Sequence, residues 1–133
     1  MHRDLKPENL MCESSPDEEV VIKLTDFGFA TYYDPDQPHT LSLGSPLYMA
    51  PELCNETEYN NKVDVWAIGV ITYVLLSGRP PFSGKNKTEI YDKINNAEPR
   101  YSQIAPASSD AKAFIKACVR KNPAERPTIA ELL

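Results

Sequence analysis

Several polar side chains near the start of the sequence have the chemistry to move a proton and to bind a cation. Asp4, Lys6 and Asn9 lie close together, and Asp26 follows a short apolar run. Carboxylate and amide oxygens are hard ligands that suit a hard cation such as Mg²⁺. The lysine amine adds a positive charge that can neutralise an anion. Such groups act together only if the surrounding chain holds them at one site.

Three short motifs contain these side chains in a recognisable order. The sequence HRDLKPEN at residues 2–9 fits the pattern H-R-D-L-x-x-x-N, DFG follows at 26–28, and APE stands at 50–52. Each motif alone is weak evidence, but three in this order and at these spacings leave a chance match below roughly 1%. On these motifs, the whole chain resembles the eukaryotic serine/threonine protein kinases.

The resemblance implies a mainly α fold: a protein-kinase-like C-terminal lobe with a small β-hairpin by the catalytic loop and a long activation segment. Residues 1–133 would form a partial protein kinase domain, from the catalytic loop to the start of the last helix. All five glycines fall at or after position 28, so the chain has no G-x-G-x-x-G loop. We therefore expect the N-terminal lobe to be absent here and present in the full-length protein.

The resemblance also implies roles in the transfer of the ATP γ-phosphoryl group to a protein substrate. Asp4 would accept and orient the substrate hydroxyl proton, and Lys6 would steady the γ-phosphate. Asn9 and Asp26 would bind Mg²⁺. The predicted catalytic residues are Asp4, Lys6 and Asn9. The predicted cofactor-binding residues are Lys6, Glu8, Asn9, Asp26 and Met11, the last of which would lie under the adenine ring.

Two residues imply which hydroxyl accepts the phosphoryl group, and three others look structural. Lys6 stands where tyrosine kinases usually carry a different sequence, and Ser45, in the activation segment, stands where most serine/threonine kinases carry threonine. A Ser/Thr acceptor follows from the resemblance. Asp64 resembles the carboxylate that ties down the catalytic-loop backbone, and Glu52 with Arg126 resembles a buried ion pair of the family.

The activation segment departs from the family pattern in two places. Arg3 resembles the arginine that meets a phosphate on this segment, because its planar guanidinium suits phosphate oxygens. Thr40 and Ser42 are candidate phosphate acceptors, but the usual activating position is occupied by Leu41. Thr31 replaces a basic residue that often binds the same phosphate. Activation by phosphorylation and a loop that needs no phosphate are therefore both open.

Hydrophobic patterning predicts the elements that would hold these residues. Two short runs, 10–12 and 20–25, predict a hairpin around a solvated polar turn at 13–19, and 29–49 predicts a long loop. The apolar stretch 63–76 predicts a helix that is buried on all sides. Further helices are expected around 90–94, after a cap at Ser108 or Ser109, and after Thr128, which with Glu131 forms a capping box.

Composition limits the classes of partner. A net charge of −5 argues against nucleic acid or an acidic membrane surface, because polyanions would be repelled. The stretch 63–76 is shorter than the roughly 20 residues that a membrane span needs. Three widely separated cysteines indicate neither a disulfide framework nor a zinc site. Together with the lack of a leader sequence after Met1, they favour an intracellular, cytoplasmic location.

The kinase group and the activity of the chain are less constrained. KLTDFGFA at 23–30 and GRPPF at 78–82 resemble the calcium/calmodulin-dependent kinase group, whereas GSPLYMAPE at 44–52 resembles the autophagy-initiating kinases. An ATP-dependent kinase, inactive as this fragment alone, is the favoured function. A non-catalytic kinase-like binding or regulatory module is the alternative. The motifs favour the enzyme, because a binding module has no need for the whole charge-neutralising set.

Overall fold

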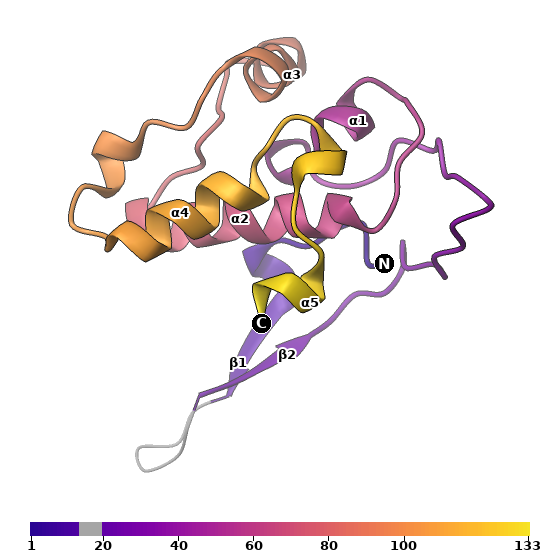
Figure 1. The fold of residues 1–133 in the computed structure, drawn as a ribbon, viewed down its shortest axis with the longest axis horizontal. Helices are drawn as coiled ribbons and strands as arrows, with labels where there is room; N and C mark the ends of the chain where they lie inside the picture. The colour runs from indigo at the N-terminus through magenta and orange to yellow at the C-terminus, as the bar shows by residue number, and fades with distance from the viewer. Residues whose placement is uncertain (14–19) are drawn as a thin grey trace.

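The computed structural model describes residues 1–13 and 20–133, so most of the polar turn predicted at 13–19 lies outside the described residues. The helices are α1 (Pro51–Cys54), α2 (Lys62–Ser77), α3 (Lys87–Asn96), α4 (Ser109–Cys118) and α5 (Ile129–Leu132). The strands are β1 (Leu10–Glu13) and β2 (Val21–Leu24). Short 3-10 turns are η1 (Pro7–Asn9), η2 (Pro46–Tyr48), η3 (Tyr101–Ile104) and η4 (Pro123–Glu125). The fold is mainly helical with one hairpin, as predicted (Figure 1).

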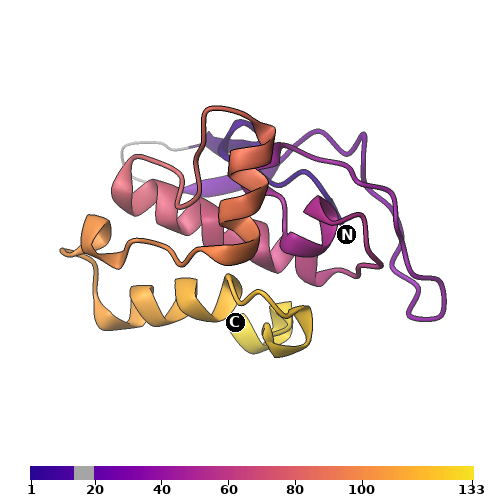
Figure 2. The same ribbon diagram turned by 90° about the horizontal axis from the view of Figure 1, so that it is seen from above.

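Helix α2 forms the centre of the helical part and packs along α4, as Figures 1 and 2 show from two directions. Its Trp66, Val70 and Tyr73 are fully buried. Gly69 permits the close approach of α4, because a Cβ there would lie 2.5 Å from the Cβ of Cys118. No helix in the described ranges is long and apolar enough to cross a membrane.

The expectation that α2 is buried on all sides is wrong for its last turn. Leu75 is 75% exposed and Leu76 is 44% exposed. Helix α2 ends at Gly78, which adopts a left-handed φ of 72° and donates its N–H to the carbonyl of Val74 at 2.8 Å. The apolar pattern correctly predicted the helix, but no element of the described chain covers its C-terminal end.

Side-chain caps fix where the shorter helices begin. Ser108 caps α4, because its hydroxyl accepts the amide of Ala111 at 3.1 Å; this decides between the two serines that the sequence left open. The predicted capping box of α5 is confirmed, since Thr128 and Glu131 bond each other's backbone amides. Helix α3 has an unpredicted cap at Asn86 and therefore begins before the expected range of 90–94.

The hairpin pairs β1 with β2 antiparallel, with Leu10 opposite Leu24. Just beyond this pair, Thr25 donates its amide to the carbonyl of Asn9 at 2.9 Å. Asn9 precedes β1 and Asp26 follows β2 closely, so the pairing brings these two distant parts of the sequence to the same end of the hairpin. The hairpin is therefore the element that sets the two predicted metal ligands near each other.

The predicted loop at 29–49 is irregular for most of its length, with two exceptions. The 3-10 turn η2 interrupts it, beginning at Pro46. An isolated antiparallel bridge also joins His39 to Tyr59, just before α2. The bridge attaches the loop to the segment before α2, and η2 contacts both α2 and α3.

Candidate functional site

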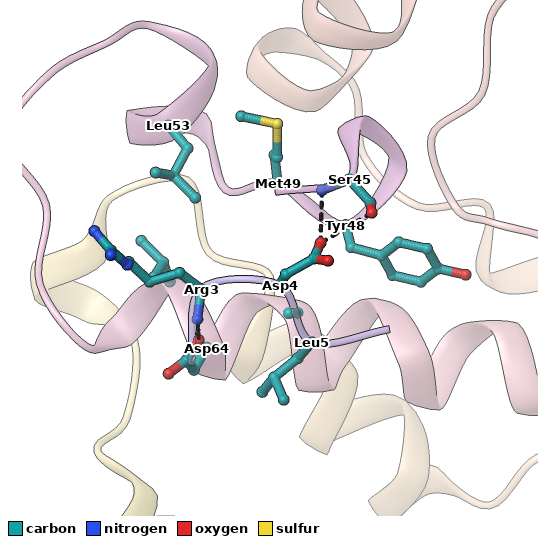
Figure 3. Close-up of a pocket in the computed structure, with 10 residues that line it drawn as sticks. Arg3, Asp4, Leu5, Ser45, Tyr48, Met49, Leu53 and Asp64 are labelled. Atoms are coloured by element: carbon teal, nitrogen blue, oxygen red, sulfur yellow. Dashed lines mark hydrogen bonds between the residues drawn. The ribbon is translucent and has the colours of Figure 1, made fainter. Parts of the chain in front are cut away.

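The backbone of the catalytic loop is attached to the start of α2 by one carboxylate. Asp64 accepts the amide of His2 at 2.7 Å and the amide of Arg3 at 2.8 Å, one on each oxygen; Figure 3 marks the second bond. Arg3 has a positive φ of 72°, a conformation that non-glycine residues rarely adopt. The bonds to Asp64 offset the cost of this conformation and fix the direction in which Asp4 leaves the loop.

His2 lies beneath the loop and is only 5% exposed. Its Nδ1 accepts the amide of Asp4 at 3.3 Å, and its Nε2 lies 3.1 Å from the carbonyl of Thr25. The ring also packs edge-on against Phe27, with centroids 5.2 Å apart. One ring nitrogen therefore braces the loop itself, while the other and the ring face connect the loop with the chain at the DFG motif, which fits a packing role.

Asp4 is the centre of a triangle of polar contacts between the catalytic loop and the activation segment. Its Oδ1 accepts the Ser45 amide at 2.8 Å and the Ser45 hydroxyl at 2.9 Å (Figure 3). Its Oδ2 forms an ion pair with Lys6 Nζ at 2.9 Å. The triangle closes because Lys6 also donates to the Ser45 hydroxyl at 2.9 Å. Asp4, Lys6 and Ser45, all singled out in the sequence, are thus in pairwise contact.

The contacts of the triangle keep Asp4 and Lys6 charged. Burial raises the pKa of Asp4, but the bonds from Lys6 and Ser45 and the charge of Lys6 outweigh it, so the pKa falls below its usual 3.8. The hydrogen bond from Lys6 to Asp4 raises the pKa of Lys6 above its usual 10.5, against a smaller opposing effect of burial. At neutral pH the site therefore holds an ionised carboxylate beside a fixed cation.

Asn9 and Asp26 present the oxygens that were predicted to bind Mg²⁺. Asn9 is 6% exposed, and its amide nitrogen donates to the carbonyl of Asp4 at 2.9 Å, which leaves its side-chain oxygen for another partner. Asp26 is exposed, with a positive φ of 58°. No cluster of three or more His, Cys, Asp or Glu occurs in the described ranges. A carboxylate and an amide still fit Mg²⁺, which usually keeps waters and phosphate oxygens as its other ligands.

The two other predicted cofactor contacts lie outside the triangle. Met11 is 56% exposed on β1, and Glu8 is exposed on η1. The negative charge of Glu8 adds to burial in raising the pKa of Tyr48, and it also helps to raise the pKa of Lys6. Glu8 therefore lies near enough to the activation segment to act on it electrostatically.

The predicted residues of the activation segment differ in how their side chains are engaged. Arg3 donates from Nε to the carbonyl of Phe29 at 2.6 Å and from Nη1 to the hydroxyl of Tyr59 at 3.0 Å. The Ser42 hydroxyl donates to the carbonyl of Leu53 at 2.9 Å, whereas Thr40 is exposed. Tyr59 was missed in the sequence, where a single tyrosine between polar residues carries no distinguishing signal.

A buried ion pair joins α1 to the segment that precedes α5. Arg126 donates to both carboxylate oxygens of Glu52, at 2.6 Å and 2.7 Å, and the two residues are 2% and 5% exposed. The guanidinium also donates to the carbonyls of Lys62, Arg120 and Lys121. Because all N–H groups of the guanidinium have acceptors, the buried charge is compensated and the pair holds the end of the activation segment against the helical core.

Comparison with known proteins agrees with the motifs. The family described as "Protein kinase domain" matches residues 1–133. The chain is 43% identical to the calcium/calmodulin-dependent protein kinase type I of Schizosaccharomyces pombe, over 100% of this chain and 41% of that protein. It is 41% identical to a probable myosin light chain kinase of Dictyostelium discoideum, over 99% of this chain and 38% of that protein.

A third relative represents the other kinase group that the sequence resembled. The chain is 37% identical to the serine/threonine-protein kinase ATG1b of Arabidopsis thaliana, over 98% of this chain and 19% of that protein. The chain thus spans about two fifths or less of the length of these three relatives. This chain belongs to the protein kinase domain family and is related to its calcium/calmodulin-dependent and ATG1 serine/threonine kinases.

Proposed function

We propose that this chain is the C-terminal lobe of an ATP-dependent protein serine/threonine kinase and carries its catalytic and Mg²⁺-binding groups. The observation that supports this most directly is the triangle of Asp4, Lys6 and Ser45, in which an ionised carboxylate lies beside a cation and a hydroxyl. Phosphoryl transfer needs groups that position a hydroxyl and neutralise charge on the phosphoryl oxygens. The triangle contains groups for both tasks.

Asp4 is the proposed proton acceptor. Its Oδ1 already accepts two hydrogen bonds from Ser45, whereas Oδ2 contacts Lys6 alone and keeps a lone pair for a substrate hydroxyl. In the proposed step, the hydroxyl oxygen bonds to the γ-phosphorus, the bond from that phosphorus to ADP breaks, and the hydroxyl proton passes to Asp4. Lys6 would move its charge toward the transferred group while it stays near Asp4.

Asn9 and Asp26 are the proposed Mg²⁺ ligands, and bound Mg²⁺ would neutralise charge on the ATP phosphates. The bond from Asn9 to the carbonyl of Asp4 supports this, because it uses the side-chain nitrogen of Asn9 and leaves the oxygen for a cation. The same bond would keep that cation at a fixed position relative to Asp4. Glu8 and Met11 are proposed to line the nucleotide side of the same cleft. Ser45 and Lys6 together favour a serine or threonine acceptor.

The exposed apolar groups beside the site suggest that another part of the kinase covers them. Met11 is 56% exposed and Phe27 is 60% exposed, although both are large apolar side chains. We propose that an N-terminal lobe, encoded in the full-length protein, covers this face and completes the ATP cleft. Residues 1–133 alone should therefore bind ATP weakly and transfer little phosphoryl group.

The test is phosphoryl transfer from radiolabelled ATP to serine- and threonine-containing peptides by the full-length protein. Asp4→Asn keeps the shape of the side chain but weakens it as a proton acceptor, so transfer should fall by about 10²- to 10⁴-fold. Asp36→Asn is the matched control, because Asp36 is exposed on the loop, and it should leave transfer unchanged. Equal, measurable transfer by wild type and Asp4→Asn would refute the role of Asp4, whereas no transfer by either would favour a non-catalytic binding module.

A further inference from the structure

Tyr59, which lies between the helices α1 and α2, contacts the activation segment through its backbone, its ring and its hydroxyl. Its backbone pairs with His39, donating at 2.9 Å and accepting at 3.5 Å, and its ring stacks on the His39 ring with centroids 5.8 Å apart. Its hydroxyl donates to the carbonyl of Leu41 at 2.9 Å. Tyr59 is only 5% exposed, so these contacts are shielded from water.

The same hydroxyl accepts a hydrogen bond from the catalytic loop. Arg3 Nη1 donates to it at 3.0 Å, and Arg3 Nε donates to the carbonyl of Phe29. Both acceptors are neutral, and no ion pair of Arg3 is found in the described part of the chain. The hydroxyl of Tyr59 thus accepts from Arg3 and donates to Leu41, so one neutral group connects the catalytic loop to the activation segment.

The position that this hydroxyl holds in place has no side chain that could be phosphorylated. Leu41 is apolar and 64% exposed, and only its carbonyl is engaged. The hydroxyl of the next residue, Ser42, is already bonded to the carbonyl of Leu53. The order of this part of the segment is therefore explained by neutral hydrogen bonds, without an anion beside Arg3.

The segment that Tyr59 holds leads directly to the catalytic carboxylate. Gly44 follows with a positive φ of 114°, and a Cβ there would lie 2.8 Å from the carbonyl of Arg3, so the chain passes closely over the catalytic loop. Ser45 then bonds Asp4 through both its amide and its hydroxyl. A displacement at residues 39–41 would consequently be passed on to the Ser45 contact.

We propose that Tyr59 is a positioning residue whose neutral hydroxyl takes the place of an activating phosphate, holding residues 39–45 so that Ser45 stays bonded to Asp4. The proposal rests on the proposed function, since it concerns the geometry of the kinase site. The contacts of Tyr59 should hold residues 39–45 in place whether or not the protein transfers phosphate. The Tyr59 hydroxyl and the Arg3 guanidinium together hold the segment, and no phosphorylation is needed for these contacts.

The first experiment measures amide hydrogen exchange in the phosphatase-treated full-length protein, and it uses no ATP. Tyr59→Phe keeps the ring but removes the hydroxyl, so exchange should become about tenfold faster in peptides that cover Ser45 and residue 59. Exchange in α2 should not change, which separates positioning from general destabilisation. If exchange at Ser45 is the same in wild type and Tyr59→Phe, the proposal is wrong, whatever the activity of the protein.

A second variant tests whether the hydroxyl stands where an anion would. Arg3 and the Leu41 carbonyl share the Tyr59 hydroxyl and so lie within two hydrogen-bond lengths of each other. Leu41→Glu added to Tyr59→Phe introduces a carboxylate within reach of Arg3, and it should restore slow exchange at Ser45 to within about twofold of wild type. Leu41→Gln is the matched neutral control and should not restore it. Equal rescue by both, or by neither, would overturn this part of the proposal.

Activity adds a third readout. Phosphatase treatment should leave wild-type transfer unchanged, because no phosphate is needed, and loss of activity would contradict the proposal. Tyr59→Phe should raise the KM for the peptide by about tenfold while the KM for ATP stays the same, because residues 39–45 lie beside the acceptor and not the nucleotide. If wild type shows no transfer at all, the proposed function fails, but the exchange results still decide the role of Tyr59.

Discussion

Two regions of the molecule are stabilised by different kinds of contact. One is the helical core around α2 and α4, and the other is the edge, formed by the catalytic loop (2–9) and the hairpin of β1 and β2. In the core, Trp66, Tyr73 and Ile115 are fully buried, and α2 and α4 approach closely over Gly69. At the edge, all four residues of β2 are exposed, and the amides of His2 and Arg3 are held by hydrogen bonds to the Asp64 carboxylate. Stability therefore lies mainly in the core, whereas the residues of the proposed site lie at the edge.

A few polar side chains connect the two regions. Asp64 belongs to α2 and bonds the catalytic loop, and the pair of Glu52 and Arg126 attaches the end of the activation segment to the core. Asp4 is itself only 6% exposed, and polar contacts with Ser45 and Lys6 hold its carboxylate. The arrangement shows that rigid positioning of Asp4 depends on a small number of directional contacts, each of which can be removed by one substitution.

The largest expected effect comes from breaking the buried ion pair. Glu52→Gln leaves the guanidinium of Arg126 buried without a negative partner, so the free energy of unfolding should fall by about 3–5 kcal/mol. Urea unfolding measures the change. The matched control is Glu58→Gln, because Glu58 is an exposed acid shortly after α1, and it should change stability by less than about 0.5 kcal/mol. Similar losses in both variants would show that the pair does not tie the edge to the core.

The sequence predicted the secondary structure better than the contacts between distant residues, for a physical reason. Helix α2 and the hairpin follow from local apolar patterns, and the Thr128 capping box follows from its own spacing. The contact between Ser45 and Asp4 joins residues 41 positions apart, and no local pattern in the sequence indicated it. The bridge by Tyr59 also depends on tertiary folding, and no local pattern marks it.

The exposure of Leu75 shows what an apolar pattern cannot predict. A run of apolar residues predicts a helix that needs cover, but it does not say whether the same chain supplies that cover. The two departures from the family pattern, at Leu41 and Thr31, were visible in the sequence. The proposed replacement of the phosphate contact could be inferred only from the structure, because it depends on the hydrogen bonds of Tyr59 with Arg3 and with a backbone carbonyl.

A smaller effect should follow from removing a charge within the edge. Lys6 is partly exposed, so Lys6→Met should change overall stability little, but it removes the hydrogen bond and charge that lower the pKa of Asp4. Burial would then raise this pKa with less opposition. The carboxyl carbon of Asp4, followed by NMR, should titrate at higher pH in Lys6→Met than in wild type. An unchanged titration would mean that Ser45 alone keeps Asp4 ionised.

The direction of the pH effect on stability follows from the same contacts. The pKa of Asp4 is lower in the folded protein than its usual 3.8, so its contribution is present above that pH and is lost as the pH falls through the folded value. The pKa of Lys6 is higher than its usual 10.5, so its contribution is present below that pH and is lost as the pH rises through the folded value. The wild-type ion pair should therefore be intact across the neutral range.

The smallest expected effect lies in the hairpin, where the contrast with the core is sharpest. Ile22 is a large apolar residue in the middle of β2, yet it is 57% exposed, so Ile22→Thr removes little buried surface and keeps the β-branched shape that suits a strand. The free energy of unfolding should change by less than about 0.5 kcal/mol. Ile115→Thr in α4 is the matched change in the core. It should cost several times more, because it buries a hydroxyl where Ile115 is fully enclosed. Equal losses at the two sites would mean that the hairpin face is covered in the full-length protein, and that the division between core and edge does not hold there.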